Sequence, residues 1–200
     1  MNKLHERSGS LDGLSPSAPG HEPHGALRGQ VQQLAQRPRR RVLGNRRDER
    51  VASQLAAADA LLYGRRRYEI FAGYWPHVSD DAHDAALART LHATPKFVAS
   101  TTHSAPLSWH STKVLDGELG AEVAGLKARY QRVHVTGSAA LLQRLLRARL
   151  VDLLELWTFP VLLGGGKRLF ADGTLPASFD LAEVMRAGSG VVITTYRLTP

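Results

Sequence analysis

The stretches of this sequence most able to do chemistry combine glycine with residues that bind anions. They are Gly64 before the three arginines Arg65–Arg67, Gly137-Ser138 between a predicted strand and helix, and Gly164–Gly166 before Lys167. A glycine turn between a strand and a helix lets an anion approach free backbone N–H groups, and the helix dipole favours negative charge there. These stretches therefore predict phosphate binding.

Each feature also has an ordinary structural explanation. Most α/β proteins contain strand-to-helix glycine turns, and Ser138 is a suitable residue to cap a helix. Arginines at a helix N-terminus oppose the helix dipole, which an anionic ligand would offset, but long side chains can also simply point into solvent. Spacing alone leaves both explanations open and favours the ordinary one.

Other site chemistries have little support in the motifs. The Gly164–Lys167 stretch lacks Walker A spacing, and Arg168 follows the lysine where Ser or Thr is required. No G-x-G-x-x-G fingerprint or G-x-S-x-G elbow occurs. The densest group of ligand-type residues has no familiar metal spacing and suits a solvated helix start: His77, Asp80, Asp81, His83 and Asp84. We predict neither nucleotide hydrolysis nor a metal site.

Length and composition indicate one soluble globular domain. The chain has 200 residues, 43% of them hydrophobic, and no apolar run is long enough to span a membrane. The N-terminus lacks the apolar centre of a secretory signal. The absence of cysteine excludes disulfides and thiol catalysis. We expect a cytoplasmic protein with no membrane partner.

The net charge of +8 is concentrated in one segment. Residues 21–50 hold eight arginines against three acids, so 8 − 3 gives +5 there and leaves +3 for the rest. This segment has few apolar residues, which predicts solvated loop or disorder. We therefore divide the chain into an atypical segment, 1–50, and a folded domain, 51–200. Nucleic-acid binding through Arg37 to Arg50 is the less favoured interpretation.

Beyond residue 50, predicted strands and helices alternate. Strands are expected at 59–63, 96–100, 111–115, 133–136 and 151–163, and helices at 51–58, 65–75, 118–130 and 139–150, with another starting at Ser79 as N-cap. Two last strands, 179–186 and 191–198, are expected to form a hairpin. The pattern predicts an α/β fold with a mostly parallel, helix-covered sheet and an antiparallel hairpin at its C-terminal end.

Ligands of such sheets bind at the carboxyl ends of the strands. Three candidate anion-binding turns follow predicted strands, at Gly64, Ser100-Thr101 and Thr136–Ser138. We therefore expect these three turns to meet at one edge.

Several stretches resemble, in order and spacing, the dihydrofolate reductase-like proteins related to the RibD C-terminal reductase domain. They are Ser10–Gly13, Ala58–Glu69, Phe71–Pro76, Pro95–Ser100, Val135–Ala139, Val151-Asp152 and Phe159–Phe170. The resemblance covers Val51 to Leu198 nearly without gaps. It implies a three-layer dihydrofolate reductase-like fold.

The resemblance also implies an NADPH-dependent reductase, often a homodimer, that transfers hydride to a small heterocyclic or carbonyl substrate. The residues expected to contact NADPH are Gly64, Arg65, Arg66, Ser100, Thr101, Thr136, Gly137, Ser138, Ala139, Ala140, Leu141, Gly164, Gly165, Gly166 and Lys167. Arginine suits a 2′-phosphate because its planar fork binds phosphate bidentately. Tyr74, Trp75 and Phe159 would wall the substrate cavity, with aromatic core packing as the alternative. Asp12 would position or protonate the substrate.

The chain departs from the family's pattern in three places. Thr101 stands where an Arg is usual, and Arg67 where a Thr is usual. The first fifty residues lack an apolar first strand and an aromatic, Gly-rich substrate-side segment. The alternative function is therefore a non-catalytic or impaired protein that keeps the fold and the cofactor pocket.

Overall fold

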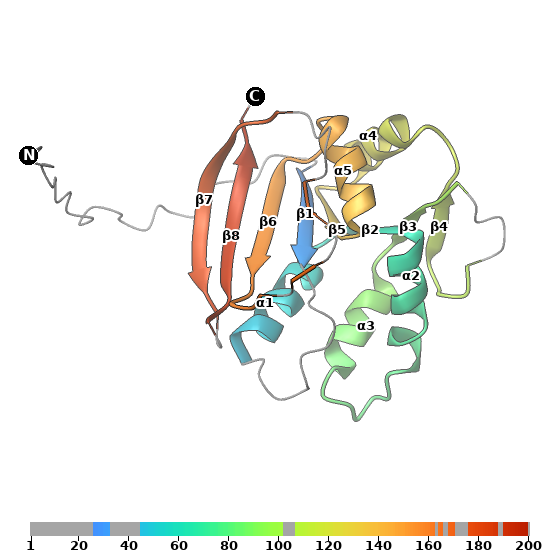
Figure 1. Ribbon diagram of the computed structural model, residues 1–200. Helices are drawn as coiled ribbons and strands as arrows, with labels where there is room; N and C mark the ends of the chain where they lie inside the picture. Colours follow the sequence, from blue (N-terminus) through green and yellow to red (C-terminus); the bar gives the residue numbers. More distant parts are fainter. Residues whose placement is uncertain are drawn as a thin grey trace, which may run out of the picture.

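The computed structural model describes residues 26–32, 45–101, 107–162, 164–165, 168–170, 176–187 and 190–199. Within these ranges, eight strands form one sheet in the order β4-β3-β2-β5-β1-β6-β8-β7 (Figure 1). The parallel strands are β1 (Ala26–Gln32), β2 (Ala60–Gly64), β3 (Lys96–Ala99), β4 (Thr112–Leu115), β5 (Arg132–Thr136) and β6 (Leu153–Thr158). Strand β8 (Val192–Leu198) pairs antiparallel with both β6 and β7 (Phe179–Arg186). The predicted parallel sheet with a C-terminal hairpin is confirmed.

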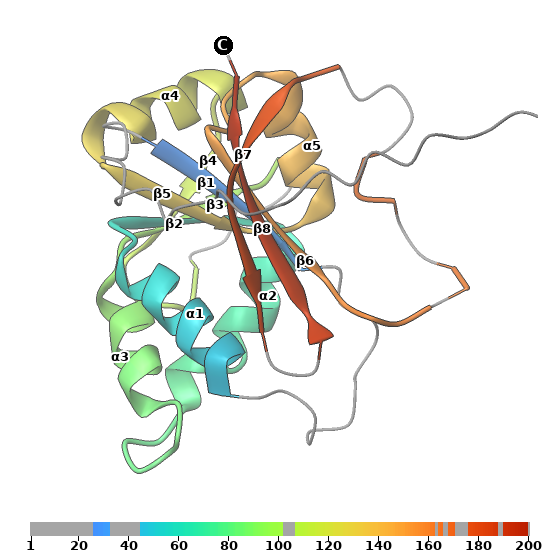
Figure 2. The same ribbon diagram turned by 90° about the vertical axis from the view of Figure 1, so that its left-hand side faces the viewer.

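Helices cover both faces of the sheet and make a three-layer arrangement (Figure 2). Helices α4 (Leu119–Arg129) and α5 (Ala139–Arg147) lie on one face. Helices α1 (Asn45–Ala56), α2 (Arg65–Ala72) and α3 (Ala85–Ala93) lie on the other, with a short 3-10 helix, η1 (Trp75–His77), after α2. Every residue of β2 is buried because helices cover it from both sides.

Strand alternation divides the core between the two faces. Leu62 and Val135 join the apolar cluster under α4 and α5, together with Leu142 and Leu145 of α5. Leu61 and Tyr63 point the other way and join a cluster with residues of α1, α2 and α3. Successive side chains of a strand face opposite sides, so a buried central strand must be apolar throughout. That requirement explains the uninterrupted Ala-Leu-Leu-Tyr run of β2.

The prediction of loop or disorder over residues 21–50 is wrong for 26–32 and 45–50. Residues 26–32 form β1, which lies between β5 and β6 near the middle of the sheet. Helix α1 begins at Asn45 rather than at Val51. The prediction was wrong because composition indicates only how much apolar surface a segment can bury. Strand β1 is joined to the sheet by its backbone, which pairs with the two neighbouring strands β5 and β6. The division of the chain at residue 50 stays a prediction.

The helix expected to start with Ser79 as its N-cap begins five residues later. Asp84 is the N-cap residue of α3, whose first residue is Ala85. Ser79 instead donates its side-chain hydrogen bond to Asp81, which, with a backbone hydrogen bond, lowers the pKa of that carboxyl. A local side-chain bond of this kind competes with helix formation, which explains the error. None of the helices in the described ranges is both long and apolar enough to cross a membrane.

Candidate functional site

The carboxyl ends of three neighbouring strands meet at one edge of the sheet. Gly64 of β2 pairs with Ala99 of β3, and Leu62 of β2 pairs with Val135 of β5. A Cβ atom placed on Gly64 would lie 3.0 Å from Ser138 Oγ. The structure therefore places the turns after β2, β3 and β5 at one edge, as the alternation of strands and helices in the sequence predicted. Their contact with a cofactor stays a prediction.

The turn from β5 into α5 is built around Gly137 and Ser138. Gly137 is buried and has φ +58°, a left-handed conformation that favours glycine, and the peptide bond between the two residues is cis. Ser138 occupies the N-cap position of α5, but its side chain makes no capping hydrogen bond. Of the two explanations that the sequence left open for Ser138, capping holds for its position but not for its hydroxyl, which lies toward Gly64. The first N–H groups of α5 and this hydroxyl suit an anion.

The three arginines of α2 have different surroundings. Arg65 is exposed and pairs with Glu69 at 3.2 Å, an interaction that contributes little at a surface. Arg66 is exposed. Arg67 is half-buried, and its guanidinium carbon lies 5.6 Å from the centroid of the Phe71 ring. The arginine that the sequence analysis left out of the cofactor contacts is thus the one that turns inward.

Arg67 also lies against the turn after β5. A Cβ atom placed on Gly137 would lie 3.5 Å from Arg67 Nη2. Burial lowers the pKa of Arg67, and the nearby Tyr63 hydroxyl partly opposes that shift. No ion pair or hydrogen bond of Arg67 is found among the residues that the structure describes. The sequence distinguishes Arg67 in one respect: it is an arginine at a position where the family usually has threonine.

Two buried hydroxyls flank this edge on the side of α1, α2 and α3. Thr136 is 7% exposed, and Tyr63 is fully buried. Neither Thr136 Oγ1 nor the Tyr63 hydroxyl has a hydrogen-bond partner within the described part of the chain. Burial raises the pKa of Tyr63. Buried polar groups are nearly always paired in native proteins, so these atoms suit a polar ligand.

The other predicted contacts are more scattered. Ser100 is half-buried after β3, Thr101 is exposed, and Ala139, Ala140 and Leu141 form the first turn of α5. Gly164 and Gly165 are exposed, with open space where a side chain would project. Gly166, Lys167 and Asp12 lie outside the described residues.

The aromatic residues predicted to wall the substrate cavity do not gather in one place: Trp75 and Phe159 pack on two different clusters, and Tyr74 is 50% exposed. Trp75 packs with Phe71 in the cluster that contains Tyr63, with the two rings tilted and their centroids 6.1 Å apart. The Tyr74 ring meets Trp75 edge to face at 5.1 Å. Phe159 packs on another cluster, which contains Trp157. The structure therefore does not join Phe159 to the other two rings in one hydrophobic cluster.

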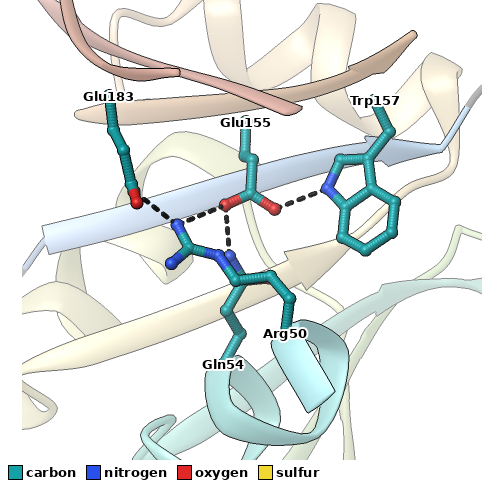
Figure 3. A network of polar contacts seen from close by, with 5 residues as sticks. All are labelled: Arg50, Gln54, Glu155, Trp157 and Glu183. Atoms are coloured by element: carbon teal, nitrogen blue, oxygen red, sulfur yellow. Dashed lines mark hydrogen bonds and ion pairs between the residues drawn. The ribbon is translucent and has the colours of Figure 1, made fainter. Parts of the chain in front are cut away.

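A second polar group lies between α1 and the sheet (Figure 3). Glu155 of β6 is fully buried and accepts hydrogen bonds from Trp157 Nε1 at 2.5 Å and from Gln54 Nε2. It also pairs with Arg50 at 3.2 Å, and Arg50 reaches Glu183 of β7 at 2.7 Å. Desolvation disfavours the charge of Arg50, but the two carboxylates outweigh it and raise the pKa of Arg50.

Both oxygens of Glu155 are engaged, so this group holds α1 against β6 and β7 and is not a free base. The sequence signal for this group is a single acid, Glu155, within the apolar run Leu153–Trp157, and it was not among the predicted site residues. A buried acid must be paired, and its partners in α1 lie about a hundred residues earlier. No group of three or more acidic or histidine side chains in the described ranges could hold a metal ion.

The layers, the strand order and the paired strand tips define a dihydrofolate reductase-like, reductase-type fold. The chain belongs to the RibD C-terminal domain family, whose model matches residues 9–193. It is 30% identical over 139 residues to the uncharacterized protein YyaP of Bacillus subtilis strain 168, which covers 69% of this chain and 73% of that protein. The family resemblance seen in the sequence is confirmed.

Solved structures support the same fold. One is a protein of Shewanella sp. PV-4 named provisionally as a riboflavin biosynthesis protein, with TM-score 0.62, 21% identity and coverage of 82% of this chain and 84% of that chain. Another is dihydrofolate reductase from Enterococcus faecalis complexed with NADP(H) and RAB-propyl, with TM-score 0.52, 12% identity and coverage of 88% and 98%. At these identities the likeness establishes the fold alone.

Proposed function

We propose that this protein is an NADPH-dependent reductase that transfers hydride to a small heterocyclic or carbonyl substrate. The observation that carries the proposal is the adjacency of Gly64 and Ser138 at the carboxyl edge of a RibD C-terminal domain sheet. These two residues are the N-caps of helices α2 and α5. Helix N-termini and glycine-lined turns favour the diphosphate of a dinucleotide.

The residues at this edge fit such a group. The Ser138 hydroxyl is not used for capping, and Thr136 Oγ1 is buried without a partner among the described residues. Glycine at 64 lets the start of α5 pack closely against the end of β2, because a Cβ there would meet Ser138 Oγ at 3.0 Å, and glycine at 137 permits the turn at φ +58° that opens α5. NADPH, when bound, would supply the hydride. The protein would hold the dinucleotide at Gly64 and at residues 136–141, and the exposed Arg65 and Arg66 would contact its adenosine-side phosphates.

Binding and turnover are tested separately. Fluorescence titration should give saturable binding of NADPH that is tighter than binding of NADH. NADPH consumption, followed at its absorbance band with pterins, pyrimidine precursors of flavins and quinoid carbonyls, then identifies the substrate class. Absence of saturable NADPH binding would refute the proposal.

Cofactor binding without turnover is the second candidate. Asp12, the carboxylate predicted to assist the substrate, belongs to the first fifty residues, which depart from the family's pattern. Glu155, the acid buried beside α1, has both oxygens engaged. Tight NADPH binding with no oxidation by any of the three substrate classes supports this candidate.

We also propose that the active form is a homodimer. The edge strand β7 carries the exposed apolar residues Leu181 and Val184, which suit burial against another copy. Light scattering coupled to size-exclusion chromatography should give twice the mass of the chain. A monomer at micromolar concentration would refute this part of the proposal.

A further inference from the structure

Arg67 is the half-buried cation at the strand tips whose charge the described residues leave uncompensated. Its guanidinium stacks on Phe71, at 5.6 Å from the ring centroid, rather than reaching a carboxylate. Burying a charge without an ion-pair partner is unfavourable. The neighbouring Arg65, in contrast, is exposed and paired with Glu69. A bound anion beside Arg67 would therefore supply the compensation that the side chains in the described ranges do not.

The position of the Arg67 guanidinium group indicates which anion it would bind. Its Nη2 atom would be 3.5 Å from a Cβ on Gly137, so the guanidinium lies directly beside the turn that opens α5. The Tyr63 hydroxyl, close enough to influence its pKa, is buried without a hydrogen bond to any described residue. A phosphate seated on the α5 N-terminus would thus meet a planar guanidinium from the side of α2, and guanidinium binds phosphate bidentately.

We propose that Arg67 binds the diphosphate of the dinucleotide, between α2 and the Gly137 turn. The inference rests on the proposed function, because it assigns a new residue to the same cofactor site. It separates two arginine roles: Arg67 contacts the part that NADPH and NADH share, whereas the exposed Arg66 contacts the 2′-phosphate that only NADPH carries. Phe71 holds the guanidinium in place by stacking.

The test compares three probes and three variants. Arg67→Met keeps an apolar stem against Phe71 and removes the charge, Arg66→Met alters the exposed neighbour, and Arg147→Met is a charge-matched control at the far end of α5. Dissociation constants are measured for NADPH, NADH and adenosine 2′-monophosphate. A charged hydrogen bond of ordinary strength corresponds to an affinity change of about 10- to 100-fold.

The expected pattern is different for each variant. Arg67→Met weakens the binding of NADPH and NADH by the same factor and leaves the affinity for adenosine 2′-monophosphate unchanged. Arg66→Met weakens the binding of NADPH and adenosine 2′-monophosphate but not that of NADH. Arg147→Met changes none of the three affinities. Without ligand, the melting temperature of Arg67→Met is unchanged or higher than that of the wild type, because an uncompensated buried charge has been removed.

Other results would overturn the inference. Unchanged NADPH affinity in Arg67→Met would do so. A loss of affinity restricted to NADPH and adenosine 2′-monophosphate would also do so, because Arg67 would then contact the 2′-phosphate rather than the diphosphate. If Arg67→Met does not fold, Arg67→Lys keeps the charge but loses the planar fork, and it must bind both dinucleotides several-fold more weakly. Failure of the wild type itself to bind any dinucleotide would instead refute the proposed function, and the wild-type titration alone reveals that case.

Discussion

Replacing Glu155 with leucine should destabilise the protein severely. The carboxylate is fully buried and accepts from Trp157, Gln54 and Arg50. Its loss removes an acceptor from the Trp157 and Gln54 donors and leaves Arg50 paired with Glu183 alone. Removing one member of a buried ion pair costs about 3–5 kcal/mol, and leucine fills most of the vacated volume without offering an acceptor. For a chain of this size each 1 kcal/mol lowers the melting temperature by about 2–4 °C. We therefore expect a fall of about 6–20 °C.

The matched control is Glu183→Gln, which removes the other carboxylate of the same arginine. The side chain of Glu183 is 45% exposed and that of Arg50 is 23% exposed, so water screens this pair. Exposed ion pairs contribute up to about 1 kcal/mol. Urea unfolding followed by circular dichroism measures the free energy of unfolding of both variants.

A double variant separates the ion pair from the other hydrogen bonds. Arg50→Met combined with Glu155→Leu removes both charges, and apolar replacement of a buried pair is often close to neutral. The double variant should therefore be more stable than Glu155→Leu alone, with a coupling energy of about 1–3 kcal/mol. A Glu155→Leu protein within about 1 kcal/mol of the wild type would refute the reasoning, as would a Glu183→Gln protein that is equally destabilised.

Three further predictions concern the strand tips and a buried lysine. Gly137→Ala places a side chain at φ +58°, which costs about 1–2 kcal/mol, so urea unfolding should show a lower free energy of unfolding. The added Cβ would lie 3.5 Å from Arg67 Nη2, so NADPH titration should show a lower affinity. Gly64→Val should lower NADPH affinity more than Gly64→Ala, because the first added carbon already meets Ser138 Oγ at 3.0 Å; equal affinities would argue against a cofactor at this turn. Desolvation lowers the pKa of Lys96 from 10.5 to about 8, so between those pH values the unfolded chain holds more protons and stability should rise with pH. Lys96→Met should abolish that rise in pH-dependent urea unfolding, whereas an unchanged pH profile would assign it to other groups.

Local pattern was enough to predict most elements around the candidate site. The β-branched run before Gly137 and the leucine spacing after Ser138 predicted β5 and α5, and the apolar run before Gly64 predicted β2. Because parallel strands end at one edge, the alternation of strands and helices also predicted that the turns after β2, β3 and β5 would share that edge. The direct adjacency of Gly64 and Ser138 came only with the structure, in which β2 and β5 are neighbours. These features depend on propensities and periodicities that a short stretch of sequence carries by itself.

Only the tertiary structure decided the features that depend on distant partners. Strand β1 has a composition typical of a loop, and its position in the sheet comes from backbone pairing with β5 and β6, about a hundred or more residues further along the chain. The inward turn of Arg67 depends on how α2 packs beside Gly137, and the pairing of Glu155 depends on how α1 crosses the sheet. A charged residue has the same local sequence signal whether it faces solvent or a buried partner, because its cost or gain is set by the groups that folding brings next to it.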